Sequence, residues 1–437
     1  MDIAMVGTGY VGLVAGVCFA DAGHRVICVD SNKDKVSQLL DGKLPFYEPG
    51  LSDLFLRNYK RMKFVYSVAE ATEKADTIFI AVGTPELPDG SADMSFTFNV
   101  LKEICESSIT PKTVILKSTV PIGTAKKAQA FCAERAKVDI EIVNNPEFLK
   151  QGAAVNDFLR PDRVVIGCRT EKAKQLMTKL YEPFVKNGHP ILFMDNASAE
   201  TTKYAANSFL ALKISFINEL SLLADKVGAD INEVRRGFTS DSRINPAFFY
   251  PGIGYGGSCF PKDVRALVHT GEEHDVDMKL LKAADEVNER QKTILAQRVK
   301  GRFGDLKGKT IALWGLSFKP HTDDVRRAPS LKLIEDLVSQ GAMVKAYDPV
   351  ALKNAQSSCQ ATFEASESAT EAAKGADALV LVTEWNEFKS ADLQELKSLM
   401  NTPIVFDGRN IYDPGKMKSL GFEYYGIGRQ ALAENER

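Results

Sequence analysis

A glycine-rich stretch at residues 251–263 (PGIGYGGSCFPKD) holds the residues of this chain that most suggest chemistry. Four glycines precede Cys259, and Lys262 and Asp263 follow it within four residues. Glycine at this density lets a backbone turn sharply and approach a ligand closely. A helix that begins after such a loop favours thiolate over thiol at its N-terminus. The pattern indicates a reactive cysteine with Asp263 one helical turn beyond it; the alternative is a buried structural cysteine.

The first thirty residues predict a unit that binds a dinucleotide. An apolar strand at 3–6 is followed at once by GTGYVG at 7–12, by a helix at 13–22, and by a second strand at 24–29 that ends in Asp30. This is the order of a Rossmann βαβ unit, in which glycines allow the tight turn and the pyrophosphate lies at the helix N-terminus.

Asp30 predicts which dinucleotide is bound. An acid at this position is expected to bind the ribose hydroxyls and to repel a 2′-phosphate, which favours NAD over NADP. The nearby Lys33 and Lys35 are a weak argument in the other direction.

Further apolar segments, at 76–82, 113–117, 140–143 and 164–167, predict more strands of the same sheet. Ligands bind outside the carboxyl ends of the strands in an open α/β sheet. Thr84, Thr119 and Glu147 follow three of these segments and are therefore candidate site residues. Roles in turns or helix caps are the alternative for Thr119 and Glu147.

Residues 196–227 contain neither Gly nor Pro, and their apolar residues recur three or four apart, which predicts one long amphipathic helix. We expect this helix to separate two domains and to carry a dimer interface; a long helix inside one domain is the alternative. Lys203 and Asn207 lie four apart and share a face, either as site residues or as part of a solvated surface.

The last third predicts a second doubly wound unit, with strands at 310–314, 343–347, 378–382 and 404–406 but no G-x-G-x-x-G. Its first strand leads into a loop with cations at Lys319, Arg326 and Arg327. Such cations suit an anionic ligand such as a diphosphate, and a solvated loop is the alternative.

The composition limits the partners and the compartment. A net charge of −2 provides no global field for nucleic acid or for an anionic membrane. The seven cysteines are dispersed without a C-x-x-C pair, which favours a reducing compartment without disulfides, and no metal site is expected. Without a signal peptide or an apolar run of membrane-spanning length, a cytoplasmic protein is expected. We predict domains at 1–195, 196–302 and 303–437.

A cofactor that accepts hydride and a poised thiolate together suggest an oxidation in which carbon becomes bonded to sulfur. A thiolate at Cys259 can capture an aldehyde, and loss of a second hydride gives a thioester that water hydrolyses. Glu147 could activate that water, while Lys203 and Asn207 could stabilise oxyanions. A two-electron hydroxyacid-type dehydrogenase, which needs no cysteine, is the alternative at this point.

Eight motifs carry a resemblance to a known family over roughly residues 1–425. They are GTGYVG at 7–12, YEPGL at 47–51, VGTP at 82–85, KSTV at 117–120, NPEFL at 145–149, KYAAN at 203–207, GYGGSCFPKD at 254–263 and FKPHTDDVR at 318–326. In this order they resemble the UDP-glucose/GDP-mannose dehydrogenase family. The resemblance implies two Rossmann-like domains joined by a long helix at a homodimer interface. It also implies oxidation of a nucleotide sugar's C6 hydroxyl to a carboxylate with two NAD⁺ and one water.

The resemblance implies a role for each matching position. For catalysis it implies Cys259 as nucleophile, Asp263 and Thr119 at the alcohol proton, Lys203 and Asn207 as oxyanion stabilisers and Glu147 as the base for thioester hydrolysis. For the NAD site it implies Gly7, Gly9, Tyr10, Val11, Gly12, Asp30, Lys35, Thr84, Pro85, Thr119, Glu147, Lys262 and Arg326. For the sugar nucleotide it implies Phe148, Leu149, Lys150, Lys203, Asn207, Phe248, Tyr250, Gly252, Phe260 and Lys319, with Arg243 reaching the substrate of the neighbouring subunit.

Three positions bear on how far the resemblance extends. Gln151 stands where some relatives have a second acid, and Arg327 stands where many have an acid. Phe260 matches the form found in members that oxidise UDP-glucose, whereas members that act on GDP-mannose tend to have leucine. We therefore expect oxidation of UDP-glucose to UDP-glucuronate, with GDP-mannose or a UDP-N-acetylhexosamine as alternative substrates. A non-catalytic nucleotide-sugar sensor is the alternative from another class.

Overall fold

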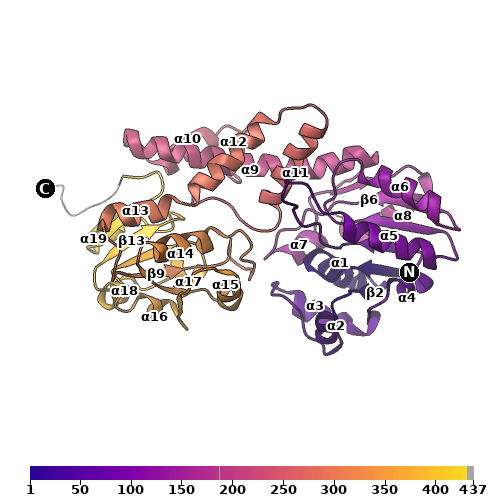
Figure 1. The fold of residues 1–437 in the computed structure, drawn as a ribbon, viewed down its shortest axis with the longest axis horizontal. Coiled ribbons are helices and arrows are strands. Elements are labelled where there is room, and N and C mark those ends of the chain that lie inside the picture. The colour runs from indigo at the N-terminus through magenta and orange to yellow at the C-terminus, as the bar shows by residue number, and fades with distance from the viewer. Residues whose placement is uncertain (187, 431–437) are drawn as a thin grey trace. The chain divides into compact units, whose positions relative to one another are not determined.

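Two sheets organise residues 1–186 and 188–430, which are the residues that the computed structural model describes (Figure 1). The chain divides into two compact units. Unit 1 comprises Met1–Ala206 with His269–Val276, and unit 2 comprises Asn207–Val268 with Asp277–Arg437.

The sheet of unit 1 has eight strands in the order β3-β2-β1-β4-β5-β6-β7-β8. Neighbouring strands are parallel except β6 and β7, which pair antiparallel. The strands are β1 (Asp2–Val6), β2 (Arg25–Val29), β3 (Met62–Val65), β4 (Thr77–Ile80), β5 (Lys112–Leu116), β6 (Ile140–Asn144), β7 (Val164–Gly167) and β8 (Ile191–Met194).

Helices cover both faces of this sheet, because its central strands bury the side chains of both faces. On β1, Ile3 and Met5 join the core on one face, and Ala4 and Val6 join the core on the other. One face is covered by α1 (Tyr10–Asp21), α3 (Leu51–Asn58), α7 (Ala154–Leu159) and α8 (Glu171–Tyr181), and the other by α4 (Val68–Lys74), α5 (Ser95–Ser107) and α6 (Thr124–Arg135).

The sheet of unit 2 has six parallel strands in the order β11-β10-β9-β12-β13-β14. They are β9 (Thr310–Trp314), β10 (Met343–Tyr347), β11 (Glu364–Ala365), β12 (Ala378–Leu381), β13 (Ile404–Asp407) and β14 (Glu423–Gly426). Again two cores lie on opposite faces; the helices that contribute to them include α13 (Ile294–Phe303), α14 (Pro329–Ser339), α16 (Ala369–Ala373), α18 (Leu393–Leu399) and α19 (Pro414–Ser419). Two Rossmann-like sheets confirm the predicted fold class.

The predicted long helix is confirmed as α9 (Asn196–Val227), and it passes from unit 1 into unit 2. Unit 2 also holds α10 (Ile231–Thr239), α12 (Lys279–Gln291) and the first half of α11 (Phe260–Glu273).

Four strands were not predicted from the sequence: β3, β8, β11 and β14, which are the edge strands of the two sheets. Each contains exposed or half-buried positions, whereas β4, β7 and β12 are buried throughout. A strand that faces solvent on one side lacks the continuous apolar run by which a buried parallel strand is recognised.

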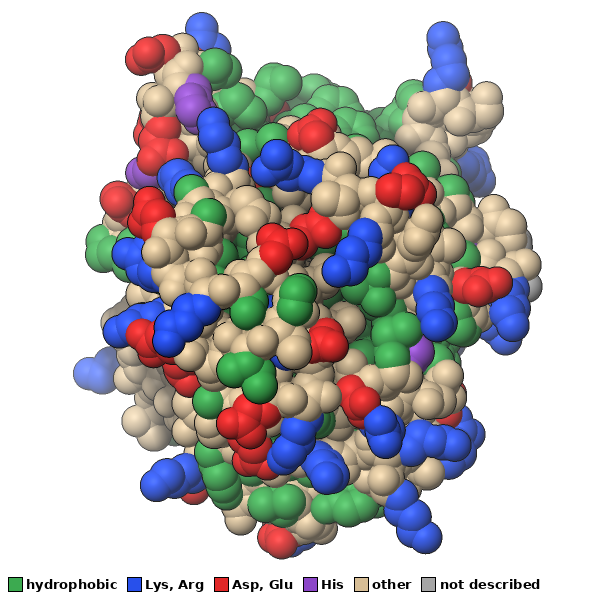
Figure 2. Space-filling view, turned by 90° about the vertical axis from the view of Figure 1, so that its right-hand side faces the viewer, with side chains coloured by type: hydrophobic (Ala, Val, Ile, Leu, Met, Phe, Trp, Pro, Cys, Tyr) green, Lys and Arg blue, Asp and Glu red, His purple; other side chains and the backbone are tan. Residues whose placement is uncertain are grey.

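The surface has no single sign of charge on the face that Figure 2 shows, where acidic and basic side chains are intermixed, in keeping with the net charge of −2. Among the described residues, no helix has both the length and the apolar character that crossing a bilayer requires.

Candidate active site

The turn between β1 and α1 forms the cradle predicted for a pyrophosphate. A Cβ atom at position 12 would lie 1.9 Å from the carbonyl oxygen of Gly7, so the turn needs glycine there. Gly9 precedes α1, no side chain caps the helix at that residue, and a Cβ built on it would meet no atom within 4 Å. The N–H groups of Tyr10 and Val11 therefore begin a helix whose N-terminus has room for an anion, as a bound NAD would require.

Asp30 lies at the end of β2 beside this turn. One of its oxygens accepts hydrogen bonds from the N–H and the hydroxyl of Thr8, at 2.9 and 2.8 Å, and the other accepts the N–H of Asn32 at 2.9 Å. Burial alone would raise the pKa of the Asp30 carboxyl, but these N–H groups, the Thr8 hydroxyl and Lys35 hold the pKa below its usual value. Asp30 is thus an ionised, half-exposed acid that fits ribose hydroxyls and disfavours a 2′-phosphate.

Hydrogen bonds connect the loop after β4 to the loop after β5, and one of them links the two predicted site residues Thr84 and Thr119. The Thr84 hydroxyl donates to the carbonyl of Thr119 at 2.9 Å, and the Ser118 hydroxyl donates to the carbonyl of Val82 at 2.6 Å. Pro85 continues the first loop. Parallel strands bring their carboxyl ends to one edge of the sheet, which is why residues 35 apart meet here.

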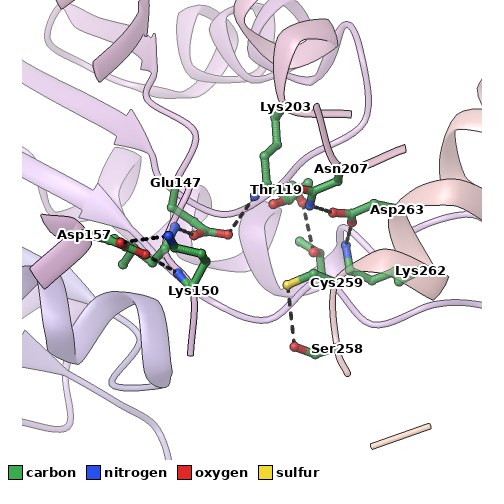
Figure 3. Close-up of polar contacts among 12 residues, drawn as sticks. Thr119, Glu147, Lys150, Asp157, Lys203, Asn207, Ser258, Cys259, Lys262 and Asp263 are labelled. Atoms are coloured by element: carbon green, nitrogen blue, oxygen red, sulfur yellow. Dashed lines mark hydrogen bonds and ion pairs between the residues drawn. The ribbon is translucent and has the colours of Figure 1, made fainter. Parts of the chain in front are cut away.

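A buried ion pair joins Glu147, in the loop after β6, to Lys203 on α9. The Lys203 ammonium lies 3.0 Å from Oε1 of Glu147, and Oε2 accepts the N–H of Leu149 at 2.6 Å; in Figure 3 the two side chains point toward each other. Burial alone would raise the pKa of the Glu147 carboxyl, but Lys203, the Leu149 N–H and the more distant Lys117 hold the pKa below its usual value. Glu147 is therefore a carboxylate at neutral pH, which a general base must be.

The residues after Glu147 form a loop that is pinned at several points. The Lys203 ammonium lies 5.2 Å from the centre of the Phe148 ring. Lys150 donates its backbone N–H to Asp157 at 2.9 Å and forms an ion pair with the same carboxylate at 3.3 Å. The residues NPEFLK thus present an acid, an aromatic ring and a cation within one short segment.

In unit 2, the structure confirms that Cys259 stands at the start of a helix. Helix α11 begins at Phe260, and the carbonyl of Cys259 accepts the N–H of Asp263 at 2.8 Å, the first bond of that helix. The Cys259 thiol is half-buried and lies 3.7 Å from the Ser258 hydroxyl (Figure 3). The Cys259 sulfur therefore lies at the positive end of the helix.

The glycines before Cys259 allow the loop after β9 to pack closely against them. Gly257 has φ +84° and donates its N–H to the carbonyl of Arg326 at 2.8 Å. A Cβ atom on Gly257 would lie 3.0 Å from the ring of Phe318. Arg326 forms an ion pair with Asp324. The bond to Asp324 and the more weakly acting Cys259 raise the pKa of the Arg326 guanidinium, although partial burial of Arg326 acts in the opposite direction. The cationic loop and the cysteine are thus neighbours within unit 2.

Asp263 is fully buried one turn into α11, between two donors. The amide of Asn207 donates to Oδ2 at 2.6 Å and the Lys262 ammonium donates to Oδ1 at 2.7 Å (Figure 3). Asn207 and Asp263, two predicted site residues that are 56 residues apart in the chain, are therefore in direct contact.

The other predicted substrate positions of unit 2 lie in two places, the segment before Cys259 and the loop after β9. Phe248 has φ +69°, a strained conformation for a bulky residue, and its ring lies 6.2 Å from that of Phe260. Gly252 donates its N–H to Asn218 at 2.8 Å. Arg243 is exposed and paired with Asp241, the Tyr250 ring lies 3.9 Å from the guanidinium of Arg235, and Lys319 lies 5.4 Å from the ring of Phe318.

The predicted site residues therefore form two groups. Unit 1 holds Gly7, Gly9, Tyr10, Val11, Gly12, Asp30, Lys35, Thr84, Pro85, Thr119, Glu147, Phe148, Leu149, Lys150 and Lys203. Unit 2 holds Asn207, Arg243, Phe248, Tyr250, Gly252, Cys259, Phe260, Lys262, Asp263, Lys319 and Arg326.

Two buried acids of unit 1 support these groups and were not predicted. Glu48 accepts the N–H groups of Gly152 and Ala154 at 2.7 and 2.8 Å and so fixes the far end of the loop that begins at Glu147. Glu200 accepts the N–H groups of Gly123 and Ala125 at 2.6 and 2.7 Å, at the start of α6. Glu48 lies in the YEPGL motif, so that motif was the available signal; nothing in the local sequence singles out Glu200.

The glycine cradle between β1 and α1, with the acid at the end of β2 beside it, is the arrangement of a dehydrogenase that binds NAD. The chain belongs to the UDP-glucose/GDP-mannose dehydrogenase family. The family's NAD binding domain matches residues 1–185, its central domain matches 197–290, and its UDP binding domain matches 312–414. The resemblance seen in the motifs is thereby confirmed, as is NAD as the cofactor.

Relatives match along the whole chain. UDP-glucose 6-dehydrogenase of Pseudomonas aeruginosa is 45% identical, with 98% of each chain covered. UDP-glucose 6-dehydrogenase YwqF of Bacillus subtilis is 43% identical, with 99% of this chain and 98% of the relative covered.

Solved structures agree. A UDP-glucose dehydrogenase from Pyrobaculum islandicum matches with a TM-score of 0.91 at 36% identity, with 98% of each chain covered. A UDP-D-ManNAc dehydrogenase from Pyrococcus horikoshii matches with a TM-score of 0.86 at 28% identity, with 98% of this chain and 99% of that one covered.

Proposed function

We propose that this chain catalyses the reaction UDP-glucose + 2 NAD⁺ + H₂O → UDP-glucuronate + 2 NADH + 3 H⁺. One observation carries the proposal: Cys259 stands at the start of α11 in a chain that matches a UDP-glucose 6-dehydrogenase over 98% of its length. A four-electron oxidation needs a way to hold the aldehyde, and a thiolate at a helix N-terminus supplies one.

NAD⁺ bound at the β1–α1 turn supplies a hydride acceptor for each of the two oxidations. Gly7, Gly9 and Gly12 give the pyrophosphate access to the helix N-terminus, and Asp30 binds the adenosine ribose. The remaining cofactor positions in this proposal are Tyr10, Val11, Lys35, Thr84, Pro85, Thr119, Glu147, Lys262 and Arg326.

In the first oxidation the C6 hydroxyl loses its proton to solvent by way of Asp263 and Thr119, and C6 loses hydride. Asp263 is suited to this because Asn207 and Lys262 hold both carboxylate oxygens in fixed positions. The product is an aldehyde, and its oxygen becomes an oxyanion when a nucleophile adds. Lys203 and Asn207 stabilise that oxyanion.

Cys259 then forms a sulfur–carbon bond to the aldehyde, giving a thiohemiacetal. Loss of the second hydride from C6 gives a thioester. Glu147 takes a proton from the attacking water, the carbon–sulfur bond breaks, and the Cys259 thiolate leaves as the carboxylate product forms. Gln151 supplies no second carboxylate, so Glu147 is the base that we propose.

The proposal also assigns residues that contact the sugar nucleotide. Lys319 takes part of the diphosphate charge, which a UDP binding domain at 312–414 supports. The other substrate contacts are Phe148, Leu149, Lys150, Lys203, Asn207, Phe248, Tyr250, Gly252 and Phe260. We further propose three functional domains, at 1–195, 196–302 and 303–437.

A homodimer through α9 is a separate proposal. Phe209, Phe216, Leu223 and Val227 are 59%, 47%, 57% and 67% exposed, and they recur every seven or four residues along one helix. Large apolar side chains in such a row favour a partner helix, and a second copy would bring Arg243 to its neighbour's substrate.

Light scattering should give twice the mass of one chain, and Phe216→Glu should shift the measured mass toward that of the monomer. A monomeric native protein would overturn the dimer. A cytoplasmic location completes the proposal.

The decisive test counts NADH per substrate with a panel of nucleotide sugars. UDP-glucose should give two NADH, whereas GDP-mannose and UDP-N-acetylhexosamines should be poor substrates. Cys259→Ala should abolish formation of the acid, while Cys359→Ala, at the other half-buried cysteine of unit 2, should leave it unchanged. One NADH per UDP-glucose, with activity that survives Cys259→Ala, would exclude the covalent route.

A further inference from the structure

Lys117, the first residue after β5, is a buried cation whose role the proposed reaction does not include. Its side chain ends inside unit 1, and the residue is 4% exposed. The amino group donates to Oδ1 of Asn145 at 3.0 Å and to the Tyr181 hydroxyl at 3.1 Å, and Tyr181 itself donates to the same Asn145 oxygen at 2.6 Å. Both partners of the amino group are neutral.

The surroundings of this amino group disfavour a charge. The rings of Phe158 on α7 and Tyr181 on α8 have their centres 5.9 and 5.6 Å from the nitrogen. The charged groups that act on Lys117 are Glu147, in the loop after β6, and Lys203 on α9. Burial lowers the pKa of Lys117 to about 7; Glu147 opposes that shift and Lys203 adds to it. Tyr181 stays a neutral phenol, because burial and Cys18 on α1 raise its pKa.

The two hydrogen bonds of Lys117 do not depend on its charge. A lysine ammonium has three N–H donors, and the neutral amine still has two. Two donors suffice for Asn145 and Tyr181, so the proton can leave without breaking either bond. Gain or loss of that proton changes the charge that acts on Glu147 while the local hydrogen bonds persist.

The position of Lys117 in the fold connects it to two proposed catalytic residues. It precedes Thr119 by two residues, and its partner Asn145 precedes Glu147 by two. Asn145 is itself fixed, because its side-chain amide donates to the carbonyl of Val165 and its backbone N–H donates to the carbonyl of Leu116. Lys117 therefore joins the loops after β5 and β6.

We propose that Lys117 is a positioning residue that joins these two loops and whose charge favours the carboxylate form of Glu147 over the protonated form. This inference rests on the proposed function, because it assigns Lys117 to the hydrolysis step. Removing the charge should raise the pKa of Glu147, which loses a nearby cation, and that of Lys203, which loses a nearby like charge. The higher pKa of Glu147 moves the acidic limb of the pH–rate profile to higher pH, because Glu147 must be ionised to act as the base. A higher pKa of Lys203, which acts as a cation, would move only the basic limb.

The test compares three variants by the pH dependence of acid formation from UDP-glucose. Lys117→Met should move the acidic limb up by about half a pH unit or more. Tyr181→Phe removes a hydrogen bond of the same cluster but keeps the charge, and its limb should stay in place. Lys112→Met removes another buried lysine, at the start of β5, which pairs with Asp76; this variant should lower stability without moving the limb. The proposal would be overturned if the acidic limb of Lys117→Met lay at the same pH as that of the native enzyme. It would also be overturned if Tyr181→Phe shifted the acidic limb as much as Lys117→Met does.

A second measurement needs neither substrate nor turnover. In protein labelled with ¹³C at glutamate Cδ, the carboxyl resonance that Glu147→Gln removes should titrate at higher pH in Lys117→Met than in the native protein, and an unchanged midpoint would overturn the proposal. If Lys117→Met does not fold, Lys117→Gln, which removes the same charge, takes its place in the comparison. Failure of the proposed function would show differently, as absence of NADH from UDP-glucose in the native enzyme.

Discussion

The two sheets begin with the same local arrangement, although only the first is followed by G-x-G-x-x-G. Gly7 follows β1 with φ +100° and donates its N–H to the carbonyl of Val29 at 2.7 Å. Gly315 follows β9 with φ +93° and donates its N–H to the carbonyl of Tyr347 at 2.8 Å. In both sheets, therefore, a left-handed glycine turns the chain beside the last residue of the second strand.

An acid follows that second strand in each sheet, and its surroundings differ. Asp30 accepts bonds from Thr8 and Asn32 and remains half-exposed. Asp348 is 3% exposed. Its oxygens accept from the indole N–H of Trp385 and from the backbone N–H groups of Leu316, Ser317, Val350 and Ala351.

The helix after the first strand also differs between the sheets. Helix α1 begins at Tyr10, four residues after β1, whereas α14 begins at Pro329, after the loop that carries Lys319 and Arg326. The same arrangement of strand, glycine and acid thus has different surroundings in the two units. In unit 1 the short turn and the open acid leave room for a dinucleotide; in unit 2 the acid is covered, and the longer loop supplies cations.

The matched substitutions Asp30→Asn and Asp348→Asn give the largest expected difference between the sheets. At Asp348 an amide would place N–H groups against buried donors, which should lower the free energy of unfolding by roughly 3 kcal/mol. At Asp30 the amide can turn toward solvent, and the loss should be below about 1 kcal/mol. Denaturant unfolding followed by circular dichroism measures both. Equal losses would mean that the two acids do not differ in structural role.

The second test asks whether the exposed acid selects the cofactor. Asp30→Ala removes the repulsion of a 2′-phosphate, so the ratio of kcat/KM for NAD to that for NADP should fall roughly tenfold or more. Steady-state kinetics with both cofactors measures this ratio. Lys35→Ala is the matched control, since it removes a nearby cation and should move the preference away from NADP. An unchanged ratio in Asp30→Ala would remove Asp30 from the ribose role.

The sequence predicted the parts of this comparison that repeat a local pattern. The β1 turn and Asp30 follow one another within thirty residues, and strands β7, β9 and β10 have the predicted bounds. Strand β7 is apolar and buried throughout, whereas in β10 exposed or half-buried positions alternate with buried ones. Contacts between distant segments were not predictable in this way. The Glu147–Lys203 pair spans 56 residues, and the bond from Trp385 to Asp348 spans 37. The family resemblance assigned catalytic roles to both Glu147 and Lys203. No sequence pattern indicated that Trp385 covers Asp348.

The third test concerns the cations of the second sheet. Lys319→Ala should raise KM for UDP-glucose about tenfold, because a charge-assisted contact to the diphosphate is lost, while KM for NAD stays the same. Lys332→Ala, on α14 and paired with Asp336, is a matched surface control in unit 2. An equal rise in both variants would show a general effect of charge, and no rise in Lys319→Ala would remove Lys319 from the substrate site.

The smallest expected effect concerns the covered acid itself. Trp385→Phe keeps an aromatic ring beside Asp348 but removes the indole N–H, which lies 3.2 Å from Oδ2. That oxygen keeps the N–H groups of Leu316 and Ser317, so the free energy of unfolding should fall by only about 1 kcal/mol. KM for NAD and for UDP-glucose should not change, because removing one donor leaves the long loop after β9 in place. A loss as large as that of Asp348→Asn would mean that Trp385, rather than the backbone, is what holds the acid.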